Sequence, residues 1–207
     1  MTTHPETMRN HWWWRPGWSV GRRFYTWHLT FEGQPDVHRL AADYRSALAP
    51  AGKALTLIPD QWLHLTMQGI GFVGEVKEVD VHAITEAARS RMADVPAFDL
   101  EIGPAILDPE AVLLPVRPDE PVRAVRDSIR AAIGDVLDAV PERAEGFTPH
   151  ISVAYSASDD PAALISGALD AAEVAPARAR ITAAELILIN RDNFMYEWEP
   201  FARVPLG

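Results

Sequence analysis

Strand patterns and helix patterns alternate along this chain, and at several points two strand patterns follow one another directly. Residues 24–31 are rich in aromatic and β-branched side chains, as strands are, whereas Val37, Leu40 and Tyr44 recur at helical spacing. Adjacent strand patterns indicate hairpins, so the order favours an α+β fold over a doubly wound parallel sheet. Strands are predicted at residues 24–31, 54–58, 62–68, 98–102, 112–116, 150–155, 186–190 and 195–204, and helices at residues 37–48, 81–92, 119–136 and 161–172.

The length and composition indicate one folded domain. A chain of 207 residues with 48% hydrophobic and 23% charged residues has the composition of a globular protein. No linker rich in Pro, Gly or Ser divides it. The sequence contains no cysteine, which excludes disulfides, thiolate nucleophiles and cysteine-ligated metal centres.

The net charge limits the class of partner. The formal charge is −10, which argues against a protein that coats long nucleic acid, because neutralisation of phosphates drives such binding. A small phosphorylated ligand in a locally positive cleft remains compatible with this charge. No apolar run approaches the roughly 18 residues of a membrane span, and no signal-peptide pattern opens the chain. We therefore expect a cytoplasmic monomer that binds no membrane.

The N-terminal 21 residues are rich in tryptophan and arginine. Trp12, Trp13, Trp14 and Trp18 fall within seven positions. Because indoles bury a large apolar area, we expect residues 1–21 to form an irregular arm that packs on a body made of residues 22–207. The alternative is that the indoles offer a stacking surface to a base or a partner.

Two short triplets carry the chemistry of the sequence: His64-Leu65-Thr66 and His150-Ile151-Ser152. Residues two apart in a strand point to the same face, so each histidine projects beside its hydroxyl. Two such strands side by side would present two imidazoles and two hydroxyls to one cleft. One imidazole can accept a proton and the other can donate one at neutral pH, while the hydroxyls hold phosphate oxygens. The set suits phosphoryl transfer without a metal.

The surroundings of these triplets resemble a known family. Residues 63–67, Leu-His-Leu-Thr-Met, and residues 147–153, Phe-Thr-Pro-His-Ile-Ser-Val, resemble the two motifs of the 2H phosphoesterases, which include bacterial 2′-5′ RNA ligases and cyclic phosphodiesterases. The 86 residues from the first histidine to the second are typical of that superfamily. From about residue 22 to the end, the resemblance implies a two-lobed, duplicated α+β sandwich of antiparallel sheets, with helices outside and a central cleft.

The resemblance also implies an activity and its residues. It implies an enzyme without metal or cofactor that acts on 2′,3′-cyclic phosphates, or related phosphodiesters, of nucleotides or RNA ends. His64 and His150 would be the acid–base pair, and Thr66 and Ser152 would hold the phosphate. His28, in the third triplet His28-Leu29-Thr30, would belong to the first strand and lie outside the catalytic pair.

Departures from the family pattern affect the expected substrate contacts. Tyr155, a candidate substrate contact, stands where the bacterial RNA ligases usually have an arginine. A phenol can donate one hydrogen bond but brings no charge, so we expect hydrolysis in preference to ligation. Arg191 and the N-terminal arginines are then candidates for the positive charge. Gln68 shares the predicted strand face of His64 and could contact substrate, or it could end the strand in water.

Aromatic residues near the motifs are candidates for binding a base. Tyr25, Trp27 and Phe147 could stack on a nucleobase, although aromatic residues in strands more often belong to the core.

Two other functions fit parts of the sequence. The first is a nucleotide-binding module without turnover, since folds can keep a site after the chemistry is lost. The second is dinucleotide binding, because Gly69, Gly71 and Gly74 match G-x-G-x-x-G between a predicted strand and a helix. However, the preceding strand alternates polar residues, whereas a first Rossmann strand is apolar on both faces. Zinc is not expected, because no H-x-x-x-H or H-x-x-E-H spacing occurs.

Overall fold

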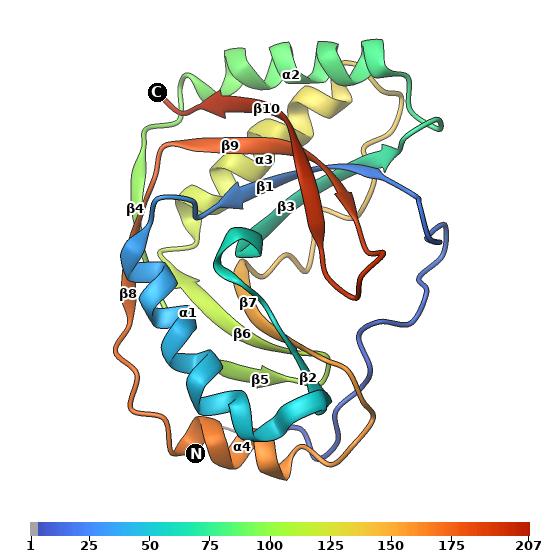
Figure 1. Cartoon of the computed structure of the whole chain (residues 1–207). Helices are drawn as coiled ribbons and strands as arrows, with labels where there is room; N and C mark the ends of the chain where they lie inside the picture. Colours follow the sequence, from blue (N-terminus) through green and yellow to red (C-terminus); the bar gives the residue numbers. More distant parts are fainter. Residues whose placement is uncertain (1–3) are drawn as a thin grey trace.

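The computed structural model describes residues 4–207, which form two antiparallel sheets with helices on their outer sides (Figure 1). The first sheet has the strand order β10-β9-β1-β3, and the second has the order β2-β7-β6-β4-β8, with β5 paired to β6. Helices α2 and α3 contact the first sheet, whereas α1 and α4 contact the second. The expected α+β sandwich of antiparallel sheets is confirmed. The strands are β1 (Phe24–Thr30), β2 (Leu55–Leu57), β3 (His64–Phe72), β4 (Phe98–Ile102), β5 (Ile106–Asp108), β6 (Ala111–Arg117), β7 (His150–Ser156), β8 (Ala177–Ile181), β9 (Ala183–Asn190) and β10 (Glu197–Pro205), and the helices are α1 (Pro35–Leu48), α2 (Glu78–Met92), α3 (Glu120–Gly134) and α4 (Ala163–Asp170), with 3-10 turns at Ala49–Ala54 and Asp60–Trp62.

The helices follow the apolar periodicity of the sequence. Val37, Leu40, Tyr44 and Leu48 of α1 are all buried, as helical spacing requires of one face. The same holds for the periodic apolar residues of α2 and α3. Pro35 occupies the first turn of α1, where its missing N–H costs nothing. None of the described helices is both long enough and apolar enough to cross a bilayer.

Two strands of the second sheet, β5 and β8, are absent from the strands predicted from the sequence. β8 has the sequence Ala-Arg-Ala-Arg-Ile, in which the small apolar residues are buried and the arginines are exposed. Alanine has a weak strand preference, so this alternation is a poor strand signal. β5 makes a short hairpin with β6 through a turn at Pro109 and Glu110.

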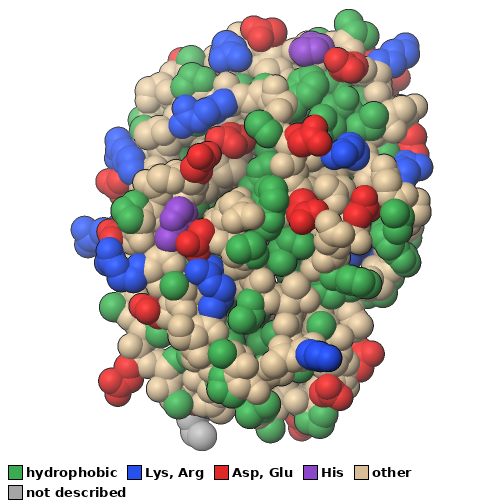
Figure 2. Space-filling view, viewed as in Figure 1, with side chains coloured by type: hydrophobic (Ala, Val, Ile, Leu, Met, Phe, Trp, Pro, Cys, Tyr) green, Lys and Arg blue, Asp and Glu red, His purple; other side chains and the backbone are tan. Residues whose placement is uncertain are grey.

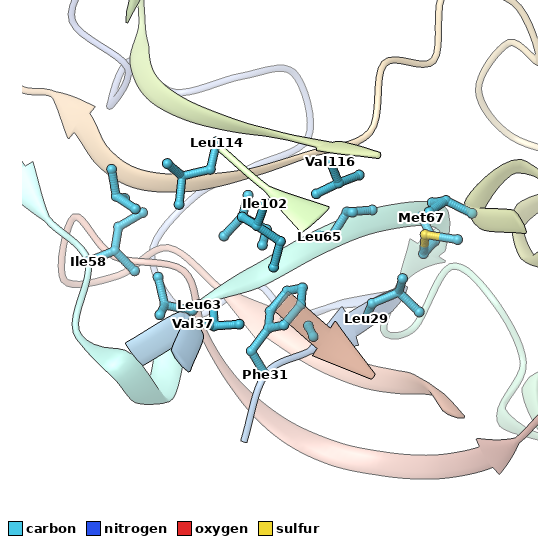
Figure 3. Close-up of a cluster of buried hydrophobic side chains, with 14 of the residues drawn as sticks. Leu29, Phe31, Val37, Ile58, Leu63, Leu65, Met67, Ile102, Leu114 and Val116 are labelled. Carbon is cyan, nitrogen blue, oxygen red and sulfur yellow. The ribbon is translucent and has the colours of Figure 1, made fainter. Parts of the chain in front are cut away.

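The main apolar core lies between the two sheets. Figure 3 shows Leu65 and Met67 of β3 facing Leu114 and Val116 of β6, with Ile102 of β4 beside them. All five side chains are buried. β3 also contacts β7, so the two strands that carry the triplets are neighbours at the junction of the sheets.

The N-terminal arm joins the open sides of the two sheets. Residues 4–21 run along the right side of the view in Figure 1, from the region of α4 up to β1. The His11 amide donates to the Ser156 carbonyl of the second sheet, and the Gly21 amide donates to the Asp192 carboxylate beside the first sheet. The predicted packing of the arm on the body is therefore seen from residue 4 onward, and residues 1–3 lie outside the described chain.

Candidate active site

A cleft of about 510 Å³ contains both predicted triplets. His64 and Thr66 line it from β3, and His150 and Ser152 line it from β7. Its wall includes residues from both sheets, the loop before β7 and the N-terminal arm: His11, Arg15, Trp18, Phe24, Thr26, His28, Asp108, Glu110, Ala111, Leu113, Glu142, Tyr155, Ile189 and Tyr196. The structure thus brings together the four residues expected to be catalytic.

The two histidines share one local geometry. Nδ1 of His64 lies 2.8 Å from the Trp62 carbonyl oxygen, and Nδ1 of His150 lies 2.8 Å from the Thr148 carbonyl oxygen. A carbonyl oxygen can only accept, so each Nδ1 carries a proton and donates it. Whenever either ring is neutral, Nε2 is therefore its unprotonated nitrogen. Each strand begins at its histidine, and the backbone two residues earlier holds the ring.

The environments of the two rings differ. Burial lowers the pKa of His64 to about 4, against a smaller upward effect from the Trp62 hydrogen bond. The nearby His150 lowers it further. His64 is thus neutral at physiological pH and able to accept a proton. His150 is more exposed than His64. Of the two hydroxyl residues, Thr66 is exposed and Ser152 is buried.

Strand β1 presents a different face to the cleft from the one expected. Phe24, Thr26 and His28 line the cleft, so the alternate residues Tyr25 and Trp27 point to the other side of the sheet. Tyr25 is buried against Phe201, and Trp27 is fully buried. The prediction that Tyr25 and Trp27 contact substrate is therefore wrong for this arrangement. His28, expected to belong to the first strand and to lie outside the catalytic pair, forms part of the cleft wall.

A β-bulge explains the position of Gln68. Trp27 pairs with Gln68 and His28 pairs with Thr66, so Met67 is an extra residue in β3. One extra residue turns the following side chains to the opposite face. Gln68 is fully buried away from the cleft, where its amide donates to the Pro141 carbonyl and accepts from Arg130. The expectation that Gln68 contacts substrate is thus wrong.

Two further candidates also lie outside the cleft. Arg191 is buried and donates to the backbone carbonyls of His11 and Trp13, so it anchors the arm. Phe147 packs beneath the Arg126 guanidinium, which donates to three backbone carbonyls and holds the loop ahead of His150. The assignments of Arg191 to phosphate and Phe147 to a base are therefore corrected.

The arm supplies residues that sequence reasoning did not place. The His11 ring stacks on Tyr155 with centroids 4.3 Å apart, and its Nε2 lies 3.0 Å from the Tyr196 hydroxyl. Burial, with Arg15 nearby, lowers the pKa of His11 to about 3. Tyr155 lines the cleft as expected of a substrate contact, and burial raises the pKa of its phenol. Within residues 4–207, Arg15 is the one arginine or lysine in the cleft wall, and it pairs with Glu110 at 2.7 Å.

The glycine motif has a structural explanation. Gly69 and Gly71 lie inside the antiparallel strand β3, and Gly74 turns the chain with φ +88°. A Cβ atom on Gly69 would lie 2.7 Å from the Phe24 ring, and one on Gly71 would collide with the Val76 side chain. The glycines thus permit close packing beside the cleft. The dinucleotide hypothesis is wrong, because it requires a parallel βαβ unit that β3 does not join.

The described residues hold no cluster of three or more His, Asp or Glu side chains placed to bind a metal ion.

Comparisons with known proteins identify the family of this fold. A search of curated proteins found no match. Solved structures with a similar fold include TT0787 of Thermus thermophilus, with 14% identity and a TM-score of 0.68 over 88% of this chain and 97% of that one. E. coli LigT complexed with 3′-AMP has 18% identity and a TM-score of 0.66 over 90% and 99% of the two chains. The model of the 2′-5′ RNA ligase superfamily matches residues 32–193. The chain therefore belongs to the 2′-5′ RNA ligase superfamily, among the 2H phosphoesterases.

Proposed function

We propose that the protein is a metal-independent phosphoesterase. Its substrate is a 2′,3′-cyclic phosphate, or a related cyclic or 2′-5′ phosphodiester, of a nucleotide or an RNA end. One observation carries the proposal: two histidines, each held through Nδ1 by a backbone carbonyl, line one cleft together with two hydroxyl residues. That set can move two protons and bind a phosphate between them.

The proposed hydrolysis uses the two histidines in opposite roles. A water oxygen attacks phosphorus, and its proton passes to Nε2 of His64, which burial keeps neutral. The bond from phosphorus to a ribose oxygen breaks, and that oxygen takes the Nε2 proton of the His150 imidazolium. Thr66 and Ser152 donate hydrogen bonds to the non-bridging oxygens, where negative charge grows. Exchange with solvent then returns both rings to their starting protonation.

The charge around the cleft supports a small substrate. Asp108, Glu110 and Glu142 line the cleft together with Arg15, so the wall offers little attraction to a polyanion. Figure 2 shows acidic and basic side chains interspersed over this face of the molecule. The fold neighbour LigT has been solved with 3′-AMP and with ATP, which are small nucleotides. We therefore expect a mononucleotide or a short RNA end.

Turnover of 2′,3′-cyclic nucleotides in EDTA tests the proposal. We expect product without added metal, and on the acid side of the pH profile kcat/KM should fall below about pH 5. The fall follows protonation of His64, whose pKa is lowered to about 4. The position of the phosphate on the product identifies the bond that breaks. Activity that EDTA abolishes and a divalent metal restores would contradict the proposal. Calorimetric binding without product would favour the nucleotide-binding module instead.

Arg15 provides a second test, directed at substrate binding. We propose that it attracts the phosphate, a role that the Tyr155 phenol cannot fill because it carries no charge. Arg15→Gln should raise KM about tenfold with a smaller change in kcat, since a charged hydrogen bond contributes about 1.5–3 kcal/mol. Arg9→Gln is the matched control, because Arg9 lies on the same arm, is 70% exposed and lies outside the cleft wall. Equal KM values in the two variants would contradict this role and leave hydrolysis itself untouched.

A further inference from the structure

We infer that His28 is a positioning residue of this site, which holds the His64 ring and directs the Thr66 hydroxyl toward the phosphate. The inference rests on the proposed phosphoesterase function and adds a third histidine to the two triplets. His28 lies on β1, opposite Thr66 in the strand register, and Thr30 lies opposite His64. His28, His64 and Thr66 therefore occupy neighbouring positions on the cleft face of two paired strands.

The ring of His28 fixes the plane of the His64 ring. The two imidazoles are stacked, with centroids 4.4 Å apart and planes only 5° from parallel. Trp198 meets both rings edge-on, at 5.9 Å from His28 and 5.3 Å from His64. The Trp62 carbonyl holds Nδ1 of His64 in the plane of its ring. With the plane and one nitrogen fixed, the direction of the remaining nitrogen, Nε2, is fixed too.

The hydrogen bonding of His28 determines which nitrogen carries its proton. Nε2 of His28 lies 3.5 Å from the Thr66 hydroxyl oxygen, whereas its Nδ1 is buried without a partner. The ring is almost fully buried, and burial lowers the pKa of His28 well below its ordinary value, so the ring is neutral with one proton. A buried N–H without an acceptor is rarer in proteins than an acceptor without a donor. The proton therefore belongs on Nε2.

This tautomer directs the threonine hydroxyl. If His28 donates to the Thr66 oxygen, the Thr66 proton does not point at His28 and is free to point into the cleft. Thr66 is exposed there, where a non-bridging phosphate oxygen would accept its hydrogen bond. The opposite tautomer would make Thr66 donate to His28 and withdraw that hydrogen bond from the phosphate.

A purely structural His28 makes a different prediction from a positioning one. The residue is buried beside Trp198 and could be a ring that fills space. In that case His28→Phe, which keeps a flat ring in the stack, should retain activity. If His28 acts through the Thr66 hydroxyl, His28→Phe removes the donor and loses activity although the stack is kept.

A double-mutant cycle separates the two cases. We expect His28→Phe to lower kcat for a 2′,3′-cyclic nucleotide by about tenfold or more, with a smaller effect on KM, since misplacing one group by about 1 Å can cost up to 10²-fold. Thr66→Val should lower kcat as well. The double variant should be no slower than Thr66→Val alone, because both changes remove the same hydrogen bond, the one from Thr66 to the phosphate. His82→Phe on the exposed face of α2 is the control for loss of a histidine.

Several outcomes would overturn the inference. Wild-type kcat in His28→Phe would do so, and so would losses that multiply in the double variant. Long-range ¹H–¹⁵N spectra of the histidine rings give a readout that does not depend on turnover. They should show His28 protonated on Nε2, and a His28 protonated on Nδ1 would refute the inference even if the enzyme is active. Absence of wild-type turnover with an Nε2-protonated His28 would instead count against the proposed function.

Discussion

Replacement of either His64 or His150 by alanine should lower kcat for the proposed 2′,3′-cyclic nucleotide hydrolysis by about 10²–10⁴-fold, the range expected for loss of one general acid or base. Both rings are held by a backbone carbonyl through Nδ1, and both line the same cleft. KM should change less than kcat, because the proposed phosphate contacts of Thr66 and Ser152 are kept in both variants. The assay uses purified variants in EDTA at pH 7.

Controls and exogenous bases sharpen this experiment. His38→Ala removes a histidine whose Nε2 donates to the Phe31 carbonyl outside the cleft, and it should keep wild-type kcat. Added imidazole should restore part of the activity of His150→Ala more readily than that of His64→Ala, because His150 is the more exposed ring. If either alanine variant keeps wild-type turnover, the two-histidine mechanism is refuted.

The double variant tests whether the histidines act as one unit. If each supplies one of two coupled proton transfers, removal of the second costs less once the first is gone. His64→Ala/His150→Ala should thus be only slightly slower than the slower single variant. Losses that multiply in full would indicate two independent contributions, such as two separate binding effects.

The sequence predicted the helices and the triplets because their signals are local. The apolar periodicity of the residues in α1 at Val37, Leu40 and Tyr44 is a property of one segment, and all three residues are buried. Likewise, His64 and Thr66 share a face because they are two residues apart before the bulge. Such inferences need no knowledge of which strands are paired.

The substrate contacts that the structure contradicts depended on strand pairing or on the alternation of side chains along β1. Gln68 follows an extra residue, Met67, and no local signal in β3 shows that the register slips there. The position of His28 could have been found, because β1 alternates between a large apolar set, Tyr25, Trp27 and Leu29, and a more polar set that contains His28. A strand with two such faces turns the more polar one toward the cleft.

The arm could not be placed from the sequence, because its contacts come from distant segments. Trp12 is held by Thr56 and by aromatic residues of β7 and the β9–β10 hairpin, and Arg191 donates to the arm's backbone. Composition indicated that some indoles are buried but did not show which. In the structure only Trp12 of the Trp12-Trp13-Trp14 run is buried, and the next two are about half exposed.

This difference within one tryptophan run predicts the second large effect. Trp12→Ala should lower the free energy of unfolding by about 3–5 kcal/mol, the usual cost of deleting a large buried aromatic side chain. The Trp12 ring packs against Tyr155 and Tyr196, and its Nε1–H donates to the Thr56 hydroxyl at 3.0 Å. At roughly 2–4 °C per kcal/mol for a chain of this size, Tm should fall by about 10 °C.

Trp14→Ala is the matched control, because it makes the same chemical change two residues away at a side chain that is 47% exposed. It should change the free energy of unfolding by about 1 kcal/mol or less. Urea unfolding followed by circular dichroism measures both variants. Because Trp12 supports Tyr155 and His11 in the cleft wall, Trp12→Ala should also raise KM at temperatures where it is still folded. Equal stabilities for the two variants would show that the arm does not dock through Trp12, and the cleft would then lack the wall that Arg15 and Trp18 provide.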